Sequence, residues 1–138
     1  MAVEGTAGTF LLLGRILFGA TLGFMALNHF MNADMMTGYA ESKGIPAPGL
    51  AVVASGVTLL LGALAILVGA YPTLGAGAVA TFLLITTPTM HNFWALEGEE
   101  QMNEMQQFLK NVALLGGALA FLAVSGQEWS FAVGVGLF

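Results

Sequence analysis

The chain contains no cysteine, so disulfide bonds, thiolate metal sites and thiol redox chemistry are excluded. Basic side chains are also scarce, because Lys and Arg number only 3 against 8 Asp and Glu, and the pI is near 4.6. Nucleic-acid binding and anionic-lipid recognition both depend on clustered Lys and Arg. We therefore expect neither function.

Charge of either sign is missing from a long central stretch. Residues 44–96 carry no formally charged side chain, a gap of 53 residues. Within it, residues 47–70 and 74–94 form two apolar runs, each long enough to cross a hydrocarbon layer of about 30 Å, which needs roughly 20 helical residues. A soluble helix of this length needs a polar face, and neither run has one. The sequence therefore predicts an integral membrane protein.

Two further apolar runs complete the pattern, at residues 9–31 and 108–124, whereas residues 129–138 are too few to span. No run alternates polar and apolar residues with a period of two, so helices are favoured over a barrel. We predict an all-α fold, an integral membrane four-helix antiparallel bundle with both termini on one side, formed by residues 1–138 as a single domain. The expected spans are 8–31, 47–70, 73–94 and 106–125.

The first run is expected to be a retained helix, because no basic residue precedes it and it is longer than a secretory signal core. We expect a multi-pass protein of the cell membrane. Arg15 near one end and an acidic loop at the other favour cytoplasmic termini. The acidic loop also suits a halophilic source, where salt screens repulsion among its glutamates. That loop contains Glu97, Glu99, Glu100 and Glu104.

Several polar side chains are expected to meet at one membrane face, where the first and third spans end and the fourth begins. They are His29, His91, Trp94, Lys110 and Asn111. Polar and ionisable residues inside spans are costly and are candidates for function. The structural alternatives are an interfacial aromatic belt for Trp94 and, for Lys110, a pairing with the acidic loop. We expect His91 to approach Lys110 or Asn111 inside the bundle.

Arg15 lies in the opposite half, roughly 9 Å into its span at 1.5 Å per residue. It either extends to the near surface or binds carbonyl or ligand oxygens inside the bundle, where its five donors need several acceptors. No carboxylate lies in any expected span to pair with it. Arg15 is therefore a further ligand-binding candidate.

Methionine forms a competing pattern on the same side as both histidines. Thioether and imidazole ligands together suit Cu(I), although methionine is also a common filler of irregular cores. The residues concerned are Met25, Met31, Met35, Met36, Met90, Met102 and Met105.

Small residues and proline mark contacts and helix ends. Gly19 and Gly23 form a GxxxG pattern, which serves either packing inside the bundle or homo-oligomerisation. Pro88 lies inside the third expected span and cannot donate to the carbonyl of Leu84. The neighbouring threonines are expected to supply hydroxyls to the freed backbone at a kink.

Ordered motifs across residues 10–125 resemble the DoxX family of small four-helix membrane proteins. They are Arg15, Gly19, Gly23, Tyr39, Gly44-Ile45-Pro46-Ala47-Pro48, Gly56, Leu59–Gly62, His91-Asn92-Phe93-Trp94 and Phe108-Leu109-Lys110-Asn111-Val112-Ala113-Leu114-Leu115-Gly116-Gly117. Two features depart from the family pattern. Thr58 stands where members commonly carry a glutamate, and the Asn28-His29 region stands where a lysine is common.

The resemblance implies a part of a membrane oxidoreductase system, since the family name comes from a subunit linked to thiosulfate:quinone oxidoreduction. Our first hypothesis is an accessory or quinone-contacting subunit with no built-in cofactor. Such a protein would be at most one subunit of a membrane oxidoreductase. The expected partners are the lipid bilayer and another membrane subunit or a second copy of the chain. The alternatives are a small transporter or Cu(I)-handling protein, and a membrane scaffold without a ligand site.

Overall fold

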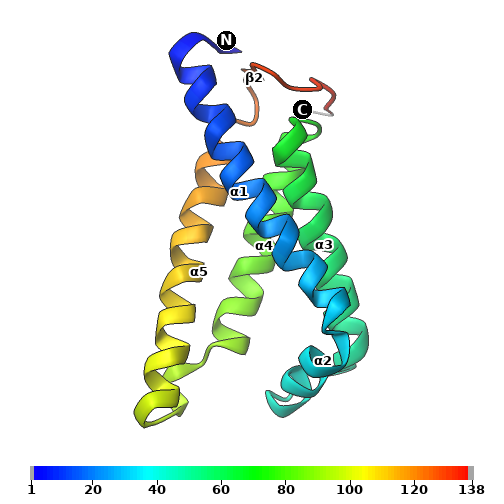
Figure 1. Cartoon of the computed structure of the whole chain (residues 1–138), viewed down its shortest axis with the longest axis vertical. Helices are drawn as coiled ribbons and strands as arrows, with labels where there is room; N and C mark the ends of the chain where they lie inside the picture. The colour runs from blue at the N-terminus through cyan, green and yellow to red at the C-terminus, as the bar shows by residue number, and fades with distance from the viewer. Residues whose placement is uncertain (1, 137–138) are drawn as a thin grey trace.

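The computed structural model describes residues 2–136, and helices dominate it (Figure 1). The helices are α1 (Gly5–Met31), α2 (Ala33–Ser42), α3 (Pro48–Val68), α4 (Pro72–Met90) and α5 (Gly98–Val124), with a 3-10 turn η1 (Phe93–Ala95). Two strands of two residues, β1 (Ala2–Val3) and β2 (Glu128–Trp129), pair in parallel.

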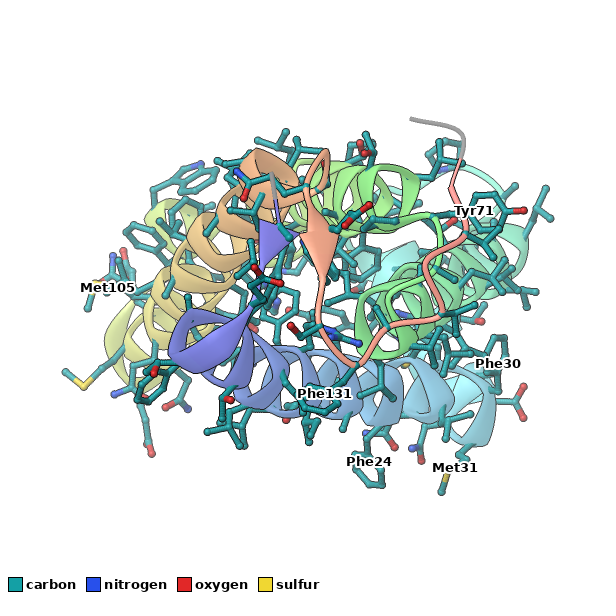
Figure 2. All side chains as sticks on the ribbon, turned by 90° about the horizontal axis from the view of Figure 1, so that it is seen from above. Phe24, Phe30, Met31, Tyr71, Met105 and Phe131 are labelled. Carbon is teal, nitrogen blue, oxygen red and sulfur yellow. The ribbon has the colours of Figure 1, made fainter. Side chains whose placement is uncertain are left out.

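Four helical segments are long and apolar enough to cross a membrane: α1, α3, α4 together with η1, and α5. The all-α membrane class is therefore confirmed. Large apolar side chains cover the outside of the molecule, among them Phe24, Phe30 and Met31, which point away from the helices in Figure 2. In water such a surface would be unfavourable, so lipid is its natural environment.

The long helices pack in the order α1, α3, α4, α5, with neighbours antiparallel and both termini at one end (Figure 1). At that end α1 and α5 also meet, since the rings of Phe18 and Phe121 lie 5.1 Å apart. Towards the other end α1 and α5 diverge, and α2 lies beside the end of α1 (Figure 1). The row of helices therefore closes on itself only near the termini.

Glycine sets the close approach of α1 to α3. A Cβ atom at Gly19 would lie 2.9 Å from the carbonyl oxygen of Ala63, and Gly23 is also buried. The GxxxG pattern therefore serves packing inside the chain, as the first of the two readings expected, and it is not free for a second copy. Gly62 and Gly75 play the same part between α3 and α4.

Two segments differ from the sequence-based expectation. Residues 33–42, expected only as a connection, form α2. The helix of the fourth expected span, α5, begins at Gly98, so residues 98–105, expected as part of a connection, are helical. The physical reason lies in the first turn of α5, where Glu99 and Glu100 interact favourably with the helix dipole.

Pro88 occupies the last turn of α4, which ends two residues later at Met90. Thr86 and Thr89 donate to the carbonyls of Phe82 and Ile85, not to that of Leu84. Thr87 Oγ1 is buried and has no hydrogen-bond partner within residues 2–136. The threonines thus bond backbone oxygens near the proline, but not the one that the proline leaves free.

Arg15 fastens the C-terminal tail to the bundle. The residue is only 1% exposed, and its guanidinium donates to the carbonyls of Ile66 and Leu67 at the end of α3 and of Ser130 and Phe131 in the tail, at 2.8–3.1 Å. The terminal carbonyls of a helix lack internal partners and carry partial negative charge, so they suit a cation. Of the two expected poses, the inward one is found.

Candidate functional site

A cavity of about 370 Å³ lies in the half of the molecule away from the termini, where α1 and α5 diverge. All five helices line it, and apolar walls such as Leu22, Val52 and Phe82 predominate. A few polar side chains converge on it: His29, Tyr39, Ser55, Thr86, Thr89, His91, Gln107, Lys110 and Asn111. A concave apolar site with a few placed polar groups is the usual form of a small-molecule site.

His91 follows the last turn of α4, where Pro88 ends the helix, and it is held by Glu104 of α5. Its Nδ1 lies 2.6 Å from Glu104 Oε2, with both side chains about one-fifth exposed. A carboxylate only accepts hydrogen bonds, so Nδ1 carries the hydrogen and the neutral ring leaves Nε2 as an acceptor. Glu104 therefore fixes the place of His91 and, when the ring is neutral, its tautomer.

Tyr39 extends this network to α2. Its hydroxyl lies 2.7 Å from Glu104 Oε1 and 2.9 Å from the carbonyl oxygen of Met90. Burial and the hydrogen-bonded, negatively charged Glu104 raise the pKa of Tyr39 above its ordinary value, because both disfavour a phenolate. Neutral Tyr39 shares its one hydroxyl hydrogen between these two acceptors and so links α2 to the end of α4 and to α5.

His29 is the second imidazole at the cavity. Its Nδ1 lies 3.1 Å from the carbonyl oxygen of Met25, one turn earlier in α1, and its ring meets Phe82 edge-on. A carbonyl oxygen accepts only, so this ring too bears its hydrogen on Nδ1 and leaves Nε2 as a lone-pair acceptor when neutral. In their neutral forms both cavity histidines thus have the same tautomer.

Lys110 and Asn111 contribute the donors. Lys110 gives one hydrogen bond to Gln107 Oε1 at 2.7 Å and has two further N–H groups. Asn111 is only 7% exposed, and no hydrogen bond of its amide is found within residues 2–136. The amide is not sealed in the core either, because Thr87 Oγ1 is the only fully enclosed, unpartnered polar atom of that part of the chain. Asn111 is therefore a cavity-lining residue whose amide has no partner within residues 2–136.

The structure brings together four of the six candidate residues, His29, His91, Lys110 and Asn111. Trp94 does not line the cavity; it is 58% exposed and packs edge-on against Phe93 and Phe108, as an interfacial belt residue would. Arg15 lies at the other end, where four of its five N–H groups are bonded to carbonyls. Neither of these two has the geometry of a cavity ligand.

The pairing of Glu104 with His91 was not predicted from the sequence, where Glu104 entered only among the acidic-loop residues of the structural alternative for Lys110. In the structure Lys110 donates to Gln107 Oε1 instead. The missed signal was helical spacing: Glu104, Gln107 and Asn111 share one face at intervals of three and four once α5 begins at Gly98.

Three of the seven methionines expected at this face line the cavity, namely Met25, Met36 and Met90. Met31, Met35, Met102 and Met105 are exposed on the outside. No group of three or more His, Asp or Glu side chains able to hold a metal is found within residues 2–136. A thioether–imidazole set is therefore the metal-binding chemistry that the cavity offers.

Thr58, the position at which the sequence was expected to depart from the family pattern, is exposed on α3 and does not line the cavity. Its hydroxyl donates to the carbonyl oxygen of Ala54 in the same helix.

Comparison with known proteins gives one result. A DoxX family model matches residues 10–92, which is more than half of the 138 residues and includes His29, Tyr39 and His91. The match ends before Glu104, Lys110 and Asn111. The assignment of these α5 residues to the site is therefore supported by the geometry alone. No curated protein and no solved structure matches the chain. Because the family model covers most of the membrane-spanning region, the chain belongs to the DoxX family.

Proposed function

We propose that the protein is a quinone-contacting membrane subunit of an oxidoreductase system, with no electron-carrying centre of its own. The observation that carries the proposal is the buried, unpartnered amide of Asn111 at an apolar cavity that Lys110 also lines. Such donors complement the oxygen atoms of a quinone ring, and the apolar walls complement the ring itself. A partner subunit would supply the electrons. The proposal places the termini in the cytoplasm and the protein in the cell membrane.

The size of the site supports this ligand class. A cavity of about 370 Å³ lies at the lower end of the usual range for small-molecule sites, roughly 300–1,000 Å³. The Asn111 amide is available to donate, because no hydrogen bond of it is found within residues 2–136 and it is not fully enclosed. A ligand oxygen that accepts from a neutral donor of this kind contributes about 0.5–1.5 kcal/mol net.

A second candidate function is Cu(I) handling. It is favoured by one observation, that Met25, Met36 and Met90 line the same cavity as both histidines. Thioether and imidazole are the neutral ligands that suit Cu(I). Lys110 opposes this function, because its positive charge would repel the ion.

The two functions are separated by titrating purified variants with a short-chain benzoquinone and with Cu(I). For a quinone site, Asn111→Leu should weaken binding by about 0.5–1.5 kcal/mol, and Lys110→Met should weaken it more because its donor is charged. Met36→Leu should change little, since volume and apolarity are kept. Asn103→Leu, on an exposed part of α5 outside the cavity, is the matched control.

For a Cu(I) site the ranking reverses: Met36→Leu removes a ligand, whereas Lys110→Met removes a repelling charge. Quinone binding that is equal in wild type, Asn111→Leu and Lys110→Met would overturn the quinone proposal. If neither probe binds, a scaffold function without a ligand site stands instead.

A further inference from the structure

The hydrogen bonds of the two cavity histidines bear on which ligand oxygens the cavity can accept. His29 donates its Nδ1 hydrogen to the Met25 carbonyl, and His91 donates its Nδ1 hydrogen to the Glu104 carboxylate. Both of these oxygens only accept hydrogen bonds. In the neutral rings both Nε2 atoms are therefore acceptors. A bound oxygen next to either ring must bring its own hydrogen, or two lone pairs face each other.

We propose that the cavity binds the hydroxyl-bearing quinol in preference to the oxidised quinone, with His29 and His91 as the residues that set this preference. The inference rests on the proposed function, since it concerns the same site. A quinol hydroxyl both donates and accepts, so it satisfies an imidazole Nε2 and still accepts from Lys110 or Asn111. A quinone carbonyl only accepts hydrogen bonds. It can therefore accept from Lys110 or Asn111, but it leaves the imidazole Nε2 without a donor.

Glu104 is the positioning residue in this arrangement. It does not line the cavity, but its carboxylate holds the hydrogen on His91 Nδ1. Tyr39 holds the other carboxylate oxygen at 2.7 Å, so the carboxylate cannot turn away without breaking a second bond. Replacing the carboxylate by an amide supplies a donor that can face Nδ1, and the hydrogen of the ring is then released to move to Nε2.

The test compares decyl-ubiquinol with decyl-ubiquinone binding to the purified full chain, under anaerobic conditions at pH 8, where free imidazole is neutral. One unpaired buried group is typically worth about tenfold in affinity. We expect the quinol to bind about tenfold more tightly, which raises the two-electron midpoint potential of the bound ring by about 30 mV. Glu104→Gln should reduce the preference, whereas Glu99→Gln, an exposed acid of the same helix, should keep it.

A second measurement, made on the protein without ligand, reports the tautomers of the two histidines. The chain has only 2 histidines, so ¹⁵N-histidine NMR reports both tautomers, and His29→Gln assigns the remaining signal to His91. We expect hydrogen on Nδ1 and none on Nε2 in the wild type. Hydrogen on Nε2 of both rings overturns the inference.

Binding of the two redox forms with equal affinity also overturns the inference but leaves the proposed function in place. Binding of neither form, with the expected tautomers present, overturns the proposed function and this inference with it.

Discussion

His91 and Glu104 lie 13 residues apart in the chain, yet His91 Nδ1 and Glu104 Oε2 are separated by only 2.6 Å. The contact joins the end of α4 to α5, and Tyr39 carries it on to α2 through the second carboxylate oxygen. Lys43 reinforces the same edge of α2 by donating to Asn92 at 2.7 Å. Side-chain hydrogen bonds thus connect α2, α4 and α5 around the cavity.

The close approach of α1 to α3 predicts that Gly19→Ala destabilises the protein. The added Cβ would lie 2.9 Å from the Ala63 carbonyl oxygen and 3.0 Å from Leu67 Cβ, so the helices must separate. Overpacking of this kind costs about 1–3 kcal/mol in free energy of unfolding. Thermal unfolding in detergent measures the loss. Gly116→Ala is the matched control, because nothing lies within 4 Å of its Cβ position, and equal melting temperatures for the two variants would contradict the packing.

The tail clamp predicts that Arg15→Leu detaches the C-terminal segment. Four carbonyls lose their donor, and each that finds no replacement costs about 1–3 kcal/mol. Trp129 is 8% exposed and lies 5.4 Å from the guanidinium, so its fluorescence should shift to longer wavelength as the tail leaves. A Trp94→Phe background leaves Trp129 as the single tryptophan of the chain.

In the same background Arg15→Lys should shift the emission less than Arg15→Leu, because three donors remain in place of five. An unchanged emission in Arg15→Leu would show that Arg15 does not hold the tail.

The raised pKa of Tyr39 predicts delayed ionisation at alkaline pH. In Tyr71→Phe, the only tyrosine left is Tyr39, and its phenolate absorbance should appear only above the ordinary tyrosine range. A raised folded-state pKa means that the neutral form stabilises the fold below the ordinary pKa, and that this contribution is lost as pH rises through the folded-state value.

Adding Glu104→Gln to Tyr71→Phe should move the ionisation of Tyr39 to lower pH, because the bonded negative charge is removed. Burial still disfavours the phenolate, so part of the delay should remain. An unaltered titration curve would count against the hydrogen bond between Tyr39 and Glu104.

The four apolar helices could be predicted from sequence. A charge-free run of about 20 apolar residues has the length of a membrane-spanning helix, and few other structures can bury it. The convergence of His29, His91, Lys110 and Asn111 followed from antiparallel order alone. The DoxX assignment, made on residues such as Arg15, Gly19 and His91, is confirmed by the family match.

The rest depended on helix boundaries, which local sequence sets weakly. Reading residues 95–106 as a loop hid the register that places Glu104 beside His91, so Glu104 was considered only as one of several acidic partners for Lys110. The inward pose of Arg15 depends partly on carbonyl oxygens of the C-terminal tail. No sequence pattern predicts that these carbonyls lie beside Arg15. The halophilic source stays a prediction.

Native mass spectrometry of the protein, extracted gently from its own membrane, tests the central claim most directly. We expect a bound species with the mass of a quinone or quinol in the wild type, reduced in Asn111→Leu and Lys110→Met and retained in Asn103→Leu. A copper adduct that Met36→Leu abolishes, or a protein that carries no small molecule in any variant, would contradict it.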